Sequence, residues 1–237
     1  MTENLSTKIV DENLDDILAN IKSAAQKVGK TADDIILLAA TKTVSPEVIN
    51  YAIEKGIKYI GENRVQEFLE KDEYVTKDVH RHFIGHLQTN KVRDIVSKVE
   101  MIQSVHSEKL ALEINRRCEA INKCMDILLE VNIGNEESKS GFLYSQVAEA
   151  AEKISKLKWV KIKGLMAIPP ICESKSQIIE YFDQMNKLFI DIKAKKIDNI
   201  DMVYLSMGMS DDYVEAILSG ANIVRIGSSL FGKRIYK

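Results

Sequence analysis

The sequence predicts an α/β fold, a TIM-like (β/α)8 barrel with an N-terminal helix, as a single domain over residues 1–237. Apolar segments of strand character alternate with helical segments almost from end to end. About eight strands are separated by helices of ~10 or more residues, which favours a closed parallel barrel over a sandwich. The length of 237 residues is usual for one such barrel. A doubly wound open sheet is the alternative, but no Gly-rich dinucleotide fingerprint follows the first strand.

The predicted elements follow one another with short connections. A leading amphipathic helix over 13–28 carries apolar residues at helical spacing and ends at Gly29. The first strand, 35–42, is followed by a helix that is capped by Ser45 and begins at Pro46. Proline suits the first position of a helix, because the amide proton that it lacks would have no partner within the helix there. The other expected strands cover 58–61, 82–85, 101–105, 125–133, 160–168, 202–207 and 223–226. The other expected helices begin at Arg64 or cover 89–99, 107–122, 143–157, 176–195 and 211–219, and a polar loop covers 134–141.

The two ends of the predicted barrel are expected to meet. Only ~10 residues follow the last strand, too few for a full outer helix and a tail. We therefore expect the leading helix to cover that place on the barrel.

Composition excludes several classes of protein. The net charge is −2, and lysine and arginine are spread through the helical segments, so we expect no nucleic-acid partner. No stretch approaches ~18 uninterrupted apolar residues, and the amino terminus has no apolar signal region, so we expect no membrane partner. Three cysteines, an odd number, occur without a secretion signal, which indicates a reducing compartment and a cytoplasmic protein.

The histidines do not form a metal-binding pattern. His80 and His82 are two residues apart, His86 follows a strand, and His106 ends another. No carboxylate or cysteine completes a recognisable ligand set, so we expect no metal.

Lys42 is the first candidate for chemistry, because it ends the apolar run over 35–41. Such a run, bounded by polar residues, is typical of a strand buried on both faces. Burial disfavours an ammonium, and a neutral amine is the nucleophile that forms a Schiff base with an aldehyde or ketone. In barrels of this kind the active site lies at the carboxyl ends of the strands, where Lys42 is placed. The alternative is a strand-end lysine whose charged head reaches water.

Further polar residues lie at the same face of the predicted barrel. Arg225 is in the last strand, which closure places beside the first, and Arg225 and Gly227 point to the same side of it. Gly227 and Ser228 offer backbone amides and a hydroxyl at the start of a helical turn, which is anion-binding geometry. Ser206 ends the seventh strand and is expected to add a hydroxyl, and Asn63 follows the second. The alternatives are an outward or ion-paired arginine and a turn that only caps a helix.

Six ordered motifs span essentially the whole chain. They are AATKT (39–43), GENRVQE (61–67), HFIGHLQTNK (82–91), GLM (164–166), LSMGMSDD (205–212) and VRIGSSLFG (224–232). Together they resemble the pyridoxal phosphate homeostasis protein family, which is similar to the barrel domain of alanine racemase, a fold-type III pyridoxal enzyme.

The resemblance implies a protein that binds pyridoxal 5′-phosphate and maintains its supply in the cell, with no established enzyme activity. By position, the implied cofactor-binding residues are Lys42, Asn63, Ser206, Arg225, Gly227 and Ser228. Lys42 would hold the cofactor as an internal aldimine, Arg225 would face the pyridine nitrogen, and Gly227 and the two serines would hold the phosphate. Asn63 would lie beside the cofactor. The family commonly has Gly-Thr-Ala where this chain has Gly-Ser-Ser, and serine keeps the hydroxyl.

Two functions fit this pattern. The first is a non-catalytic carrier that stores pyridoxal 5′-phosphate or delivers it to apo-enzymes, its expected protein partners. The alternative is a fold-type III amino-acid racemase, whereas a Schiff-base aldolase fits the barrel lysine but not the motifs. Racemases of this type carry a further β-domain, whose dimer partner supplies a second base, and this chain has only ~10 residues after the last strand. We therefore expect a monomeric carrier, with weak racemase activity left open.

Overall fold

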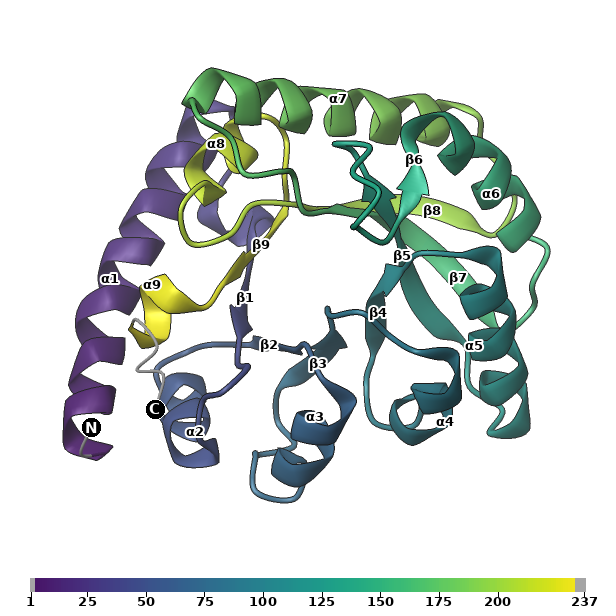
Figure 1. The fold of residues 1–237 in the computed structure, drawn as a ribbon. Coiled ribbons are helices and arrows are strands. Elements are labelled where there is room, and N and C mark those ends of the chain that lie inside the picture. Colours follow the sequence, from purple (N-terminus) through teal and green to yellow (C-terminus); the bar gives the residue numbers. More distant parts are fainter. Residues whose placement is uncertain (1–2, 233–237) are drawn as a thin grey trace.

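The computed structural model describes residues 3–232, so the ends of the predicted domain, 1–2 and 233–237, lie outside the described residues. The strands are β1 (Ile36–Ala40), β2 (Tyr59–Glu62), β3 (His80–Phe83), β4 (Met101–Val105), β5 (Met125–Asn132), β6 (Phe142–Leu143), β7 (Val160–Ala167), β8 (Ile200–Ser206) and β9 (Ile223–Ile226). The α-helices are α1 (Glu3–Lys27), α2 (Pro46–Glu54), α3 (Val65–Lys71), α4 (Val92–Ile95), α5 (Glu108–Ala120), α6 (Val147–Ile154), α7 (Lys175–Ala194), α8 (Tyr213–Leu218) and α9 (Ser228–Phe231). The strands lie inside and the helices outside (Figure 1).

Eight parallel strands close into a barrel. Hydrogen-bonded neighbours follow the order β4-β3-β2-β1-β9-β8-β7-β5, and pairing of β5 with β4 completes the ring. β1 pairs with β9 in parallel, with Leu38 opposite Arg225. The predicted TIM-like (β/α)8 barrel is confirmed, and its first and last strands are neighbours, as expected.

α1 covers the barrel beside the last strand, where α9 has only four residues. Asn13 of α1 donates to the carbonyl of Leu230 at 3.1 Å, and Asn20 donates to the hydroxyl of Tyr213 at 3.0 Å. These contacts bind α1 to α9 and α8, and Figure 1 shows it running along both. The expected role of the leading helix is confirmed, although α1 reaches back to Glu3, well before residue 13.

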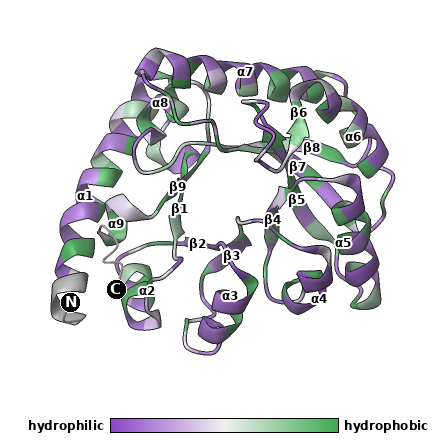
Figure 2. Cartoon of the chain, viewed as in Figure 1, coloured by the Kyte–Doolittle hydropathy of each residue, from purple (hydrophilic) through white to green (hydrophobic). Residues whose placement is uncertain are grey.

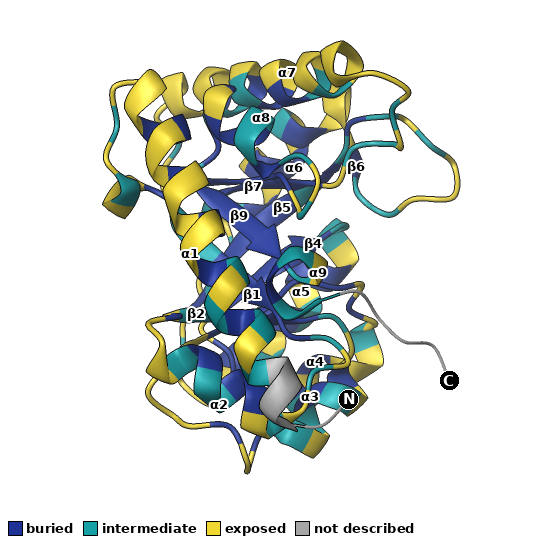
Figure 3. Cartoon of the chain, turned by 90° about the vertical axis from the view of Figure 1, so that its left-hand side faces the viewer, coloured by how far each residue is buried: buried dark blue, intermediate teal, exposed yellow. Residues whose placement is uncertain are grey.

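Apolar packing holds the strands on both sides. The main core lies between strands and helices, and hydrophobic and hydrophilic residues alternate along the outer helices (Figure 2). The strands are largely buried, whereas α1 and α7 expose many residues (Figure 3). Two smaller apolar clusters fill the barrel interior: Leu38, Ala40, Ile84 and Ile223, and then Met101, Leu128 and Met166. A packed interior keeps the carboxyl ends of the strands in fixed positions.

The expected helix over 89–99 is shorter than predicted. A 3₁₀ turn, Thr89–Lys91, precedes α4, which is a single turn. Lys123 donates to the carbonyls of Val96 and Val99 at 2.8 and 2.6 Å, so these carbonyls find partners without a longer helix.

Two strands also differ from expectation. β3 begins at His80 instead of residue 82, because the His80 amide donates to the Lys58 carbonyl at 2.9 Å and extends the pairing with β2. The loop 134–141 leads into β6, which pairs with the carboxyl end of β5. Gly141, at φ 121°, permits this approach, because a Cβ there would lie 2.6 Å from the Asn132 amide.

Within residues 3–232, no helix combines the length and apolar character needed to span a membrane.

Candidate functional site

Lys42 lies just beyond the carboxyl end of β1. That strand ends at Ala40, so the half-buried Lys42 belongs to the following turn and not to the strand. The next residue, Thr43, has a left-handed backbone with φ 64°. Because β1 pairs with β9, this turn is adjacent to the end of the strand that contains Arg225.

Arg225 is buried in the barrel interior, with 4% of its surface exposed. Its Nη1 donates to Ser206 Oγ at 2.7 Å, and its Nη2 donates to the Ala167 carbonyl at 2.9 Å. Burial lowers the pKa of the guanidinium to about 10, against the charges of Asp212 and Glu130, which raise it. Arg225 is therefore an oriented cation at neutral pH. It does not face outward, and no carboxylate of the described residues lies at hydrogen-bond distance from it.

A chain of hydrogen bonds continues from Arg225 across the barrel. The fully buried Ser206 donates to Gln103 Oε1 at 2.7 Å, and Gln103 Nε2 lies 2.8 Å from His82 Nδ1. Burial, with a smaller effect of His80, lowers the pKa of His82 to about 3, so its ring is neutral and Nδ1 accepts. The direction of donation is thus Arg225 to Ser206 to Gln103 to His82.

This chain affects the predicted phosphate contact of Ser206. Its hydroxyl has one proton, which is committed to Gln103, while its oxygen accepts from Arg225. A phosphate dianion only accepts hydrogen bonds, so Ser206 can bind it only after turning away from Gln103. The contact stays a prediction, and the structure adds a second role, which is to hold the guanidinium.

The glycine–serine turn after β9 presents converging backbone amides. The amides of Gly227 and Ser229 donate to Ser210 Oγ at 3.3 and 3.2 Å, and the Ser229 hydroxyl donates to the Ser210 carbonyl at 3.2 Å. Two amides aimed at one oxygen form the geometry that holds an oxyanion. The exposed Ser228 is at the first position of α9. These residues fit a phosphate group.

Asn63 follows β2 and is half-buried. Among the described residues, its buried Oδ1 atom has no hydrogen-bond partner. Gly85 allows this position, since a Cβ there would lie 2.1 Å from the Asn63 carbonyl oxygen. A buried polar atom without a protein partner is costly, so it is suited to a ligand contact.

Sequence reasoning missed Gln103, His82 and Ser210. Gln103 carries a detectable signal, because it is a polar residue that directly follows two apolar residues of β4. His82 carries none, since three of the four residues of β3 are polar. Ser210 carries none, since its role depends on how the loop after β8 folds back onto the turn after β9.

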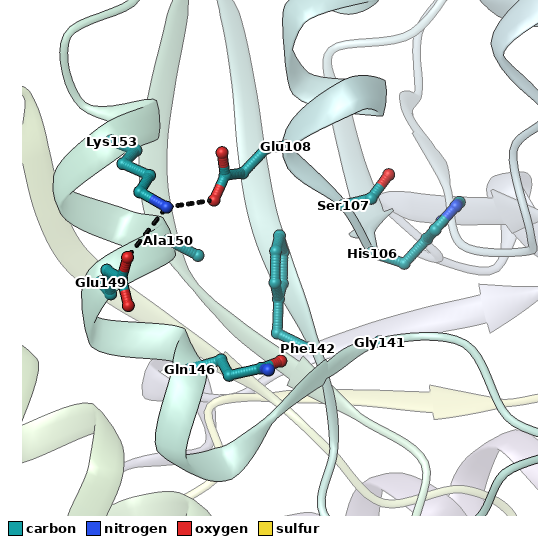
Figure 4. Close-up of a pocket in the computed structure, with 9 residues that line it drawn as sticks. All are labelled: His106, Ser107, Glu108, Gly141, Phe142, Gln146, Glu149, Ala150 and Lys153. Carbon is teal, nitrogen blue, oxygen red and sulfur yellow. Dashed lines mark hydrogen bonds and ion pairs between the residues drawn. The ribbon is translucent and has the colours of Figure 1, made fainter.

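A separate cavity of about 450 Å³ lies between the start of α5 and α6 (Figure 4). None of the predicted site residues lines it. Its Lys153 is bonded to both Glu108 and Glu149, at 3.1 and 2.9 Å, so its charge is already balanced. The neighbouring His106 stacks on His86, with ring centroids 4.5 Å apart.

Over residues 3–232, no group of three or more histidines, cysteines or carboxylates is placed to bind a metal.

We predict that Gln103→Leu destabilises the protein although it keeps a side chain of similar volume. The Ser206 hydroxyl would lose its acceptor and His82 its donor, and a buried unsatisfied group costs about 1–3 kcal/mol. Urea unfolding should therefore show a lower free energy of unfolding. The exposed Gln66→Leu is the control and should change it by no more than about 0.5 kcal/mol. Equal stabilities of the two variants would contradict the chain of hydrogen bonds.

Comparison with known proteins is consistent with this geometry. The alanine racemase N-terminal domain family matches residues 13–235. A pyridoxal phosphate homeostasis protein of Aquifex aeolicus is 43% identical over 226 residues, which covers 95% of this chain and 98% of that protein. A structure of an unknown protein from Bifidobacterium adolescentis has a TM-score of 0.90 at 32% identity and covers 98% of both chains. PipY of Synechococcus elongatus, solved with PLP bound, has a TM-score of 0.79 at 28% identity and covers 90% of this chain and 100% of its own. The chain therefore belongs to the pyridoxal phosphate homeostasis protein family and has the fold of the alanine racemase N-terminal domain.

Proposed function

We propose that this protein binds pyridoxal 5′-phosphate, is covalently linked to it through Lys42, and holds it for storage or delivery in the cell. The observation that carries the proposal is the pairing of β1 with β9, which brings the Lys42 turn to the end of the strand that contains the buried Arg225, where two backbone amides converge. The relatives named pyridoxal phosphate homeostasis proteins and the PLP complex of PipY support it.

Each site residue has a separate task in this proposal. When bound, the cofactor supplies an aldehyde that a lysine amine can attack and a ring that withdraws electrons. Arg225 offers a donor to the ring nitrogen, and Gly227 and Ser228 bind the phosphate with their amides and a hydroxyl. Ser206 orients Arg225 and is available to the phosphate if its hydroxyl turns. Asn63 contacts the cofactor beside Lys42.

Two residues, Arg225 and Tyr204, favour a carrier function over racemase activity. With a pKa of about 10, Arg225 keeps its protons at neutral pH, so it donates a hydrogen bond to the ring nitrogen without protonating it. Tyr204 lies two residues before Ser206, where it packs against the apolar interior clusters, so it is a poor candidate for a second base. A cytoplasmic location, a monomeric state and apo-enzymes as recipients belong to the same proposal.

We predict that Lys42→Ala abolishes the covalent adduct. Borohydride reduction of the wild-type protein loaded with pyridoxal 5′-phosphate should fix the cofactor to Lys42, as read by mass spectrometry of its peptides. Lys58→Ala is the matched control, since Lys58 is exposed at the opposite end of the barrel, and it should keep the adduct. An adduct on another lysine of the wild-type protein would show that the assignment is wrong.

The phosphate should supply much of the binding free energy. Hydrogen bonds to charged groups contribute roughly 1.5–3 kcal/mol each, so pyridoxal without its phosphate should bind at least ~100-fold more weakly. Titration of the visible absorbance with each compound measures the two dissociation constants. Comparable affinities would rule out the turn after β9 as a phosphate site.

The protein should not racemise amino acids at rates typical of enzymes. Proton transfer on both faces of a substrate carbon normally needs two positioned bases, each worth roughly 10²–10⁴-fold, and an unprotonated ring stabilises a carbanion poorly. Chiral chromatography after long incubation with L-alanine and other amino acids is the measurement. Turnover on the order of 1 s⁻¹ or faster would favour the racemase.

A further inference from the structure

The turn that carries Lys42 is strained. Thr43 has φ 64°, a left-handed backbone that a β-branched residue rarely adopts. Its hydroxyl donates to the Lys42 carbonyl at 2.6 Å, which closes the turn on itself. Such a conformation persists only where neighbouring groups enforce it.

A cluster from β2 and α3, formed by Glu62, Glu67 and Lys71, holds this turn from both sides of Lys42. On the far side, Glu67 Oε1 accepts the amide of Thr43. On the near side, Thr41 donates its hydroxyl to Glu62 Oε1 at 2.7 Å. Both residues adjacent to Lys42 are therefore bonded to the cluster.

Lys71 joins the two sides. Its Nζ lies 2.8 Å from Glu67 Oε1, 3.1 Å from Glu62 Oε1 and 2.9 Å from the Thr41 carbonyl. An ammonium has three protons, and each has an acceptor here. The side chains of Lys71 and Glu62 are only 13% and 5% exposed, so the loss of one partner leaves a poorly solvated charge.

The electrostatics of the two carboxylates differ in a way that fits this arrangement. Burial raises the pKa of Glu62, against the charge of Lys71. Burial also disfavours the Glu67 carboxylate, but hydrogen bonds from Lys71 and from the Thr43 amide outweigh it and lower the pKa of Glu67. Glu67 is thus a charged acceptor for the backbone amide of Thr43, the residue with the left-handed conformation.

α3 does not need Glu67 and Lys71 to stay in place. Its Val65 and Phe68 are buried in the main core. At its carboxyl end, Asp72 is bonded to Arg81, Lys77 and Lys98. The contacts of Glu67 and Lys71 with the 41–43 turn are therefore additional to those that anchor the helix.

We propose that Glu67 and Lys71, with Glu62, are positioning residues that hold the 41–43 turn and so direct Lys42 toward the cofactor aldehyde. This inference rests on the proposed function, since it requires Lys42 to be the attachment point. It also gives a role to the Gly-Glu-Asn-Arg-Val-Gln-Glu motif, of which the cofactor site uses only Asn63.

Two ligands separate positioning of Lys42 from general binding. Pyridoxal 5′-phosphate can be linked to a lysine, whereas pyridoxine 5′-phosphate, which has an alcohol in place of the aldehyde, cannot. In Glu67→Ala and Lys71→Met, the borohydride-trapped adduct should form about 10- to 100-fold more slowly, because misplacing a reacting group by about 1 Å costs up to 10²-fold in rate. Affinity for the aldehyde should fall as well, because the lysine is no longer held in place for the bond, whereas affinity for the alcohol should stay within about 2-fold.

Glu70→Ala is the matched control, since Glu70 is exposed on the same helix and its carboxylate accepts from Gln66. It should behave as the wild type with both ligands. Glu67→Gln keeps an oxygen that accepts the Thr43 amide, so it should retain more affinity for the aldehyde than Glu67→Ala. Thermal unfolding of each variant without ligand confirms that it is folded.

Three results would overturn the inference. They are an equal loss of affinity for both ligands, no loss for either, and Glu67→Gln as impaired as Glu67→Ala. Lys42→Ala, measured in parallel, tests the proposed function separately. If that variant binds pyridoxal 5′-phosphate as tightly as the wild type and wild-type adduct lies elsewhere, the attachment point is wrong, whatever the cluster variants show.

Discussion

The parallel pairing of β1 with β9 is the constraint on which the site depends. Without that closure, the Lys42 turn and Arg225 would lie at opposite edges of an open sheet, almost two hundred residues apart in sequence. Closure removes both edges and makes the first and last strands neighbours, in a register that places Leu38 beside Arg225. α1 protects this seam from outside through its contacts with α8 and α9. The helix that precedes the barrel thus supports the place where the site is assembled.

Burying a guanidinium inside the barrel is costly, and the interior is organised to limit that cost. The Ala167 carbonyl and Ser206 accept from it, while Glu130 and Asp212 oppose the loss of its charge. Gln103 accepts the proton of Ser206 and donates in turn to the neutral His82. The polar groups of several strands are therefore satisfied by one continuous chain of hydrogen bonds. Apolar clusters fill the rest of the interior and keep this chain in register.

Much of this arrangement could be predicted from the sequence, because it depends on local signals. Apolar strand segments, helix-capping residues and glycines at helix ends predicted the order of the strands and the closed barrel. They also predicted which residues follow the ends of the strands. The contacts between side chains could not be predicted in the same way. Whether Gln103 meets Ser206 depends on the relative register of β4 and β8, which no local pattern encodes. The contact of Glu67 with Thr43 depends on a left-handed turn at a threonine, a residue whose type argues against it.

Ser210 adds a reason why the site suits exchange rather than permanent retention. Its hydroxyl already accepts from the Gly227 and Ser229 amides at 3.3 and 3.2 Å. A phosphate oxygen that binds there has to replace this partner, and its negative charge makes its hydrogen bonds to the two amides stronger than those of the neutral hydroxyl. After the phosphate leaves, Ser210 can satisfy the amides again, which lowers the cost of release. In the proposed carrier, Lys42 then supplies retention through a reversible covalent bond, and the phosphate turn supplies selectivity without making release prohibitively slow.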